Sequence, residues 1–236
     1  MTSTPHTLKA FDEEQNALRA LIRRMGEHAQ RALDDALRCL LEHDAEGAAR
    51  IVARDHQLDD MEAQAETHVV QIIARRAPMA DDLRDLIAAH KIAGTVERIG
   101  DYAKNIAKRV PMLEPVGEAA SPSPLPVSLL PEMGRVAGAQ VHDALEAFIT
   151  RDATLAAQVC ASDRVVDDYY TAMLRSLLTC MMEAPQNIAP ATHLLFVARN
   201  IERIGDHATN LAEMVYFAAT GQRLGERVRG EDGVRL

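Results

Sequence analysis

The chain has no tryptophan, and aromatic residues make up only 3% of its 236 positions. Sheets are enriched in aromatic and β-branched residues, whereas packed helices are filled mainly by straight-chain and small side chains. Hydrophobic residues still make up 47% of the sequence, which is ample material for a core. The scarcity of aromatic residues therefore favours a helical protein.

Cysteine is also scarce, and the three cysteines, Cys39, Cys160 and Cys180, form no close pair. An odd, scattered set excludes a disulfide framework and a zinc knuckle, so we expect buried free thiols in a reducing compartment. The segment from Met1 to Lys9 is polar, unlike a signal peptide, and no apolar run approaches the roughly 18 residues of a membrane span. The sequence predicts a cytoplasmic protein.

Positive charge is in deficit, because 26 Lys and Arg residues face 35 Asp and Glu residues, for a net charge of -9. The basic residues are interspersed among acidic ones and form no stripe, which argues against nucleic-acid binding. Clustered carboxylates on an acidic protein point instead to cations or to basic protein partners.

Proline is concentrated in one segment, since six of the ten prolines lie between Pro111 and Pro131. Proline lacks a backbone donor and clashes with the preceding helical turn, so no helix should cross this segment. We therefore expect two halves joined by a linker. The predicted boundaries are a first bundle at 8–110, a linker at 111–127, a second bundle at 128–220 and a flexible tail at 221–236.

An internal duplication relates the two halves. The pentapeptide Glu-Arg-Ile-Gly-Asp occurs at 97–101 and again at 202–206, and eight of the eleven positions of 97–107 are identical in 202–212. Earlier residues recur at an offset of 108, as Asp44 does at Asp152. A repeat of this length predicts a duplicated architecture.

Each half has the pattern of three long helices. The expected helices span 11–43, 45–76 and 80–110 in the first half, and 128–150, 153–183 and 188–219 in the second. In the third helix of each half, apolar residues recur at alternating steps of four and three, which is typical of a core-facing seam. The sequence thus predicts an all-α fold of two tandem three-helix bundles. The first seam contains Ile92, Val96, Ile99, Ala103, Ile106 and Val110, and the second Val197, Ile201, Ile204, Ala208, Leu211 and Val215.

Carboxylates four residues apart mark the second and third helices of each half. Four helical residues rise about 6 Å, so each pair lines one edge of a groove between neighbouring helices. Four converging carboxylates would repel one another unless a cation lay between them. Oxygen ligands without cysteine favour Mg, Mn, Ca or Fe, with Zn as a further option. The candidate ligands are Asp55, Asp59, Glu97 and Asp101 in the first half, and Asp163, Asp167, Glu202 and Asp206 in the second.

Several of these features have a purely structural interpretation, which the residues alone leave open. Charged residues four apart on a helix commonly form a solvated face. Gly100 and Gly205, inside the motif, cost helix stability and either admit a close backbone or metal-bridging group or simply allow tight helix packing. Arg98 and Arg203 either hold a carboxylate of the motif or pair with acids at the surface.

Enzymatic signatures are absent from the sequence. It contains no Glu-x-x-His of the di-iron bundles, no glycine-rich phosphate loop, no nucleophile elbow and no Cys-x-x-Cys. We therefore predict a protein without enzymatic activity. The alternative is a metal-storage protein or a metal-dependent enzyme built on helical bundles.

The duplicated pentapeptide, with Asp-x-x-x-Asp in the preceding helix, resembles the PhoU family of phosphate-signalling proteins. The stretches at 73–78, 82–84 and 199–201 share this resemblance, which covers the chain from about Phe11 to Gly221. Acidic motifs of this family are associated with metal clusters on the bundle surface. The resemblance therefore implies Fe, Mn, Mg or Zn at the two sites. Tyr170 stands where Glu62 stands in the first half, so we expect fewer supporting ligands at the second site.

The resemblance further implies a cytoplasmic negative regulator of the phosphate-starvation response and of phosphate uptake. Its expected partners are the ATPase subunit of the phosphate importer and a sensor histidine kinase, which would be its only link to the membrane. The exposed helical flanks lead us to expect a homodimer, and no nucleic-acid partner is expected.

Overall fold

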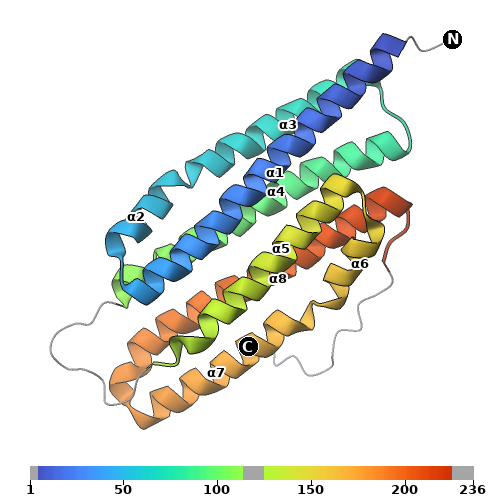
Figure 1. Cartoon of the computed structure of the whole chain (residues 1–236). Helices are drawn as coiled ribbons and strands as arrows, with labels where there is room; N and C mark the ends of the chain where they lie inside the picture. Colours follow the sequence, from blue (N-terminus) through green and yellow to red (C-terminus); the bar gives the residue numbers. More distant parts are fainter. Residues whose placement is uncertain (1–4, 114–124, 225–236) are drawn as a thin grey trace.

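The computed structural model describes residues 5–113 and 125–224, which form eight α-helices in two groups lying side by side (Figure 1). These described residues contain no β-strand, and each half has the three-helix plan, so the predicted fold class is confirmed. Most of the predicted linker and tail falls at 114–124 and 225–236, outside the described residues. The helices are α1 (Pro5–Glu42), α2 (Ala45–Arg54), α3 (His56–Arg76), α4 (Asp81–Ala107), α5 (Leu130–Thr150), α6 (Ala153–Ala161), α7 (Arg164–Glu183) and α8 (Ile188–Thr220), with short 3-10 turns at Val110–Met112, Val127–Leu129 and Pro185–Asn187.

The second helix of each half is broken, and the prediction of unbroken helices over 45–76 and 153–183 was wrong. In the first half the break falls at Asp55, where the His56 Nδ1 lies 2.9 Å from the Ala53 carbonyl oxygen. In the second half Gln140 of α5 donates to the Ser162 carbonyl at 2.9 Å, and the Ser162 hydroxyl donates to the Val159 carbonyl at 2.8 Å. Side chains that bond to backbone groups compete with the helical ladder, which explains both breaks.

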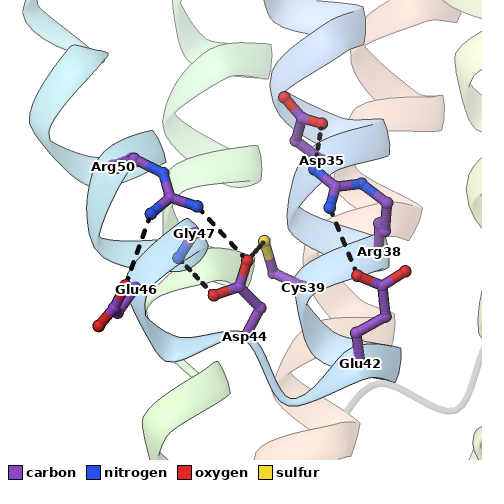
Figure 2. A network of polar contacts seen from close by, with 8 residues as sticks. All are labelled: Asp35, Arg38, Cys39, Glu42, Asp44, Glu46, Gly47 and Arg50. Atoms are coloured by element: carbon purple, nitrogen blue, oxygen red, sulfur yellow. Dashed lines mark hydrogen bonds and ion pairs between the residues drawn. The ribbon is translucent and has the colours of Figure 1, made fainter.

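The turns that enter the second helices are duplicated as well. His43 and Arg151, 108 residues apart, both have a φ of 55°, and an aspartate follows each of them. Asp44 accepts from the Gly47 amide at 2.7 Å, and Asp152 accepts from the amides of the first turn of α6. Figure 2 shows the first of these turns, where Asp44 also pairs with Arg50 at 3.5 Å. Such caps satisfy amides that the helix itself leaves unbonded.

The predicted seams form the centre of the core. Every residue of both seams is at most 2% exposed, which confirms that the four-and-three periodicity identifies the buried faces of α4, with the turn that follows it, and of α8. The three cysteines are also buried and free, as expected.

The two halves share one core instead of folding around two separate ones. Helix α1 packs against α5 and α4 against α8, so these four helices lie at the centre in Figure 1. At Gly26 a Cβ would meet Leu145 Cδ1 at 2.1 Å, and at Gly134 it would meet Leu37 Cδ1 at the same distance. Since these two contacts are related by the 108-residue offset, the halves pack around an approximate twofold axis.

In the described parts of the chain, no helix is both long and apolar enough to cross a membrane.

Candidate functional site

The first acidic cluster lies where the break after α2 approaches α4. It consists of four carboxylates, those of Asp55, Asp59, Glu97 and Asp101. Burial, followed by the negative charges of the neighbouring carboxylates, raises the pKa of Glu97 to about 7. Glu62, one turn after Asp59 on α3, supplies one of these neighbouring charges. The structure therefore brings the four predicted residues of this half together: Asp55, Asp59, Glu97 and Asp101.

A lysine of α4 supplies a positive charge to the first acidic cluster. The Lys104 ammonium donates to Asp55 Oδ2 at 2.5 Å and also to Asp101, so it links the break after α2 to α4. Burial opposes the charged form, but the hydrogen bonds to the two aspartates raise the pKa of Lys104 nevertheless. The ammonium stays protonated and partly neutralises the cluster from within.

The corresponding carboxylates of the second half form the second acidic cluster, between the start of α7 and α8. Burial and the charge of Asp206 raise the pKa of Glu202 to about 7, although the charge of Arg199 opposes this rise. Burial and the charges of Asp163 and Asp206 likewise raise the pKa of Asp167. All four predicted residues of the second half are again gathered in one place: Asp163, Asp167, Glu202 and Asp206.

The second acidic cluster has no lysine at the position of Lys104. Thr209 takes that place and donates to Asp163 Oδ1 at 2.7 Å. Arg199 donates to Glu202 Oε1 at 2.6 Å, whereas Glu202 Oε2 is buried and has no hydrogen-bond partner among the described residues. A buried carboxylate oxygen without a partner is costly, and a bound cation would satisfy it.

The two clusters therefore differ in how well they fit a metal ion. In the second, the unpartnered Glu202 oxygen and the surrounding acids suit a divalent cation, whereas in the first a metal would have to displace the Lys104 ammonium. With the side chains of residues 5–113 and 125–224 as they stand, no group of three or more His, Cys, Asp or Glu is arranged to hold a metal ion. Metal loading would require the carboxylates of the cluster to rotate towards one another.

The glycines of the motif serve helix packing, one of the two interpretations the sequence left open. A Cβ on Gly100 would lie 2.2 Å from Leu58 Cδ1, and one on Gly205 would lie 3.2 Å from Val166 Cγ2. Leu58 and Val166 are 108 residues apart, so an apolar side chain at the equivalent position of the second helix packs on the glycine of the third in both halves. These contacts hold α3 against α4 and α7 against α8 at the height of the clusters.

The arginines of the motif form no ion pair with a carboxylate of the described residues. The Arg203 guanidinium lies 5.8 Å from the centre of the Tyr102 ring, and neither Arg98 nor Arg203 makes an ion pair with another described residue. The charge of Arg203 nevertheless opposes the rise that burial causes in the pKa of Glu202, so this arginine acts on a carboxylate of the motif without an ion pair. His207 stacks on Tyr102, with ring centres 5.4 Å apart, where α8 crosses α4.

Sequence reasoning missed Lys104, Thr209 and Arg199. The sequence does contain a signal for the first two, because the charged Lys104 corresponds to the uncharged Thr209 within an otherwise repeated motif. Tyr170, which replaces Glu62, lies 5.5 Å from the Arg199 guanidinium. At this position the first half has a further carboxylate, whereas the second half has an aromatic ring with an arginine above it.

The fold and these clusters define a class of protein: a duplicated helical bundle with an acidic cluster between the second and third helices of each half. A family model described as the PhoU domain matches the chain twice, at residues 22–110 and 130–215. The chain belongs to the PhoU family.

Curated relatives support this membership. One relative, a "phosphate-specific transport system accessory protein PhoU homolog" of Zymomonas mobilis, is 51% identical over 227 residues, covering 96% of this chain and 94% of the relative. A homolog of the same description from Caulobacter vibrioides is 42% identical over 221 residues, covering 94% of each chain.

Solved structures share the fold. The crystal structure of PhoU from Pseudomonas aeruginosa has a TM-score of 0.82 at 35% identity and covers 90% of this chain and 100% of that one. The phosphate transport system regulatory protein PhoU from Streptococcus pneumoniae has a TM-score of 0.81 at 26% identity, covering 92% of this chain and 100% of its own.

Proposed function

We propose that the chain is a non-catalytic accessory protein that negatively regulates phosphate uptake and the phosphate-starvation response. The observation that carries this proposal is the match of nearly the whole chain to proteins named as phosphate transport accessory or regulatory proteins. In this role it would act from the cytoplasm as an adaptor between the ATPase of the phosphate importer and a sensor histidine kinase.

The acidic clusters give the adaptor a metal-binding surface. In the second acidic cluster a divalent cation, Fe, Mn, Mg or Zn, would be held by Glu202 and the aspartates around it. The bound ion would supply positive charge and would join the start of α7 to α8. The unpartnered Glu202 Oε2 supports this assignment.

In the first acidic cluster the Lys104 ammonium already supplies that positive charge between Asp55 and Asp101. We therefore propose that the second cluster binds metal more tightly than the first. The helices of the first half would be joined by an ion pair where those of the second are joined by a metal.

Metal content measured by elemental mass spectrometry tests this assignment, on protein purified without chelator or nickel resin. Glu202→Ala with Asp206→Ala should abolish most of the bound metal, whereas Glu97→Ala with Asp101→Ala should remove little. Lys104→Thr should raise the metal content, because it gives the first cluster the residue found in the second. Wild-type protein that stays folded and free of metal would contradict the metal assignment.

Docking on both partners is supported by apolar side chains that remain exposed at matching places. Val70 on α3 is 60% exposed, and its duplicate on α7, Leu178, is 49% exposed. A partner helix or groove can bind a helical face through such apolar side chains.

A co-purification experiment with the importer ATPase and with the kinase tests the adaptor role. Val70→Asp and Leu178→Asp should each weaken capture of at least one partner. A matched change at a polar exposed position, Gln57→Asp, serves as the control. Deletion of the gene should raise phosphate uptake in phosphate-rich medium, and unchanged uptake would contradict the regulatory role.

A further inference from the structure

A groove with a volume of about 510 Å³ lies between α4 and α8, where the two halves meet. Both helices and the residues that follow α8 line it, so anything bound there would touch both halves. A volume of this size is typical of sites for small molecules. The acidic clusters make no contribution to its lining.

Basic side chains converge on this groove, although the chain as a whole is acidic. Lys91 and Arg98 lie seven residues apart on α4 and so face the same side, and Arg223 approaches from beyond the end of α8. None of the three makes an ion pair within the described parts of the chain. Glu213 also lines the groove, and it already interacts with another residue of the protein.

Apolar side chains line the groove as well. Met214, Phe217 and Leu224 line it, and Phe217 is 41% exposed. Thr95, His207 and Asn210 add polar groups to the lining. A ligand that matches both the basic and the apolar side chains carries negative charge at one end and a flat apolar ring at the other.

The duplication supplies an internal comparison. At the offset of 105, Lys91 corresponds to Phe196 and Met214 to Arg109. There the Arg109 guanidinium lies 4.6 Å from the centre of the Phe196 ring, and its Nη1 lies 3.4 Å from His193 Nδ1. At that end the cation and the aromatic ring contact each other, whereas in the groove the three cations form no ion pair with a described residue and Phe217 is partly exposed.

We propose that this groove binds a nucleotide with two or more phosphates. The phosphates would contact Arg98, Lys91 and Arg223, and the base would lie against Phe217 and Met214. Because the ligand bridges α4 and α8, its binding would favour one arrangement of the two halves. The proposal goes beyond the phosphate-regulatory role and does not depend on metal binding.

Isothermal titration calorimetry with ATP, on chelator-treated protein, tests the proposal without interference from the acidic clusters. We expect saturable binding with one site per chain. Arg98→Gln should weaken it about tenfold, the loss expected for one charge-assisted contact. Arg203→Gln is the matched control, since Arg203 holds the same place in the duplicated motif but does not line the groove, and it should leave affinity unchanged.

Two further titrations identify the part of the ligand that is recognised. Phe217→Ala should weaken ATP binding but not the weaker binding of pyrophosphate. Pyrophosphate that binds as tightly as ATP, or ATP binding that Phe217→Ala leaves unchanged, would show an anion site without base recognition and would overturn the nucleotide assignment. No saturable binding at about 1 mM ATP would overturn the site as a whole. Circular dichroism of each variant, with unchanged helicity, ensures that a loss of binding reflects the groove.

Discussion

Lys104 and Thr209 show how a difference at one position gives two otherwise repeated sites a different charge. Both sit three residues after the last aspartate of the motif, and each contacts an aspartate in the break of the second helix. A lysine at this place brings a permanent charge into the acidic cluster, whereas a threonine brings only a hydroxyl donor. The same backbone therefore supports an internally neutralised cluster in one half and a cluster in need of a cation in the other.

Thr209→Lys should accordingly remove metal from the second acidic cluster. An ammonium at this position would reach Asp163 and Asp206 as Lys104 reaches Asp55 and Asp101. We expect bound metal to fall to the level of the Glu202→Ala, Asp206→Ala variant, measured by elemental mass spectrometry. Thr209→Ser serves as the control and should retain the metal.

Glu202 should make the stability of the metal-free protein depend on pH. Its folded pKa of about 7 lies above the ordinary value of 4.5, so the folded state binds the proton more tightly than the unfolded state. This contribution is fully present below pH 4.5 and is lost as the pH rises through 7. Since each tenfold in proton affinity is worth about 1.4 kcal/mol, the effect is on the order of 3 kcal/mol.

Urea unfolding of wild type and Glu202→Gln, both with chelator, measures this effect. The variant cannot ionise, so its free energy of unfolding should gain on that of wild type between pH 5 and pH 8. Parallel pH profiles for the two proteins would contradict the assignment of the raised pKa to Glu202. With metal present the trend should weaken, because a cation stabilises the ionised carboxylate.

At the scale of the elements, glycines decide how closely the helices approach. In α5 a Cβ on Gly134 would meet Leu37 of α1 at 2.1 Å, whereas no atom lies within 4 Å of one on Gly138. The two glycines are one turn apart in the same helix, so they form a matched pair.

Gly134→Ala should destabilise the protein, and Gly138→Ala should stabilise it. At Gly134 the added methyl group must displace a buried leucine, a cost of about 1–3 kcal/mol. At Gly138 the gain in helix propensity is up to about 1 kcal/mol with no steric cost. Urea unfolding of both variants checks the signs, and equal effects would show that the packing of α1 on α5 is not as described.

The breaks in the second helix of each half are features of the elements that the sequence did not predict. The apolar periodicity predicted the extent of the second helices but not the interruptions at Asp55 and at Ser162. Those depend on a histidine that bonds to the backbone in one half and on Gln140 from a different helix in the other. Bonds of this kind, above all those from distant residues, have no local signal.

At the scale of the whole molecule, the shared core makes the two halves one cooperative unit. Leu37 and Leu145 each fill a glycine site of the opposite half, so neither half buries its apolar surface alone. Such coupling favours a single unfolding transition despite the tandem architecture.

Differential scanning calorimetry should therefore show one transition, with calorimetric and van't Hoff enthalpies that agree. Leu37→Ala, in the first half, should lower the Tm of the whole protein by the loss of about 2–5 kcal/mol. Two separated transitions, only one of which moves in this variant, would show that the halves unfold independently.

The sequence by itself determined the helical class, the duplication, the buried seams and the eight carboxylates of the two clusters. These follow from composition, periodicity and repetition, which are local properties of the chain. Only the tertiary structure decided that the halves share a core, that Lys104 neutralises one cluster, and that Glu202 Oε2 lacks a partner in the other. It also decided that basic and apolar side chains of α4 and α8 face one groove. Each depends on groups far apart in the sequence, whose charge and burial take effect only once folding has brought them together.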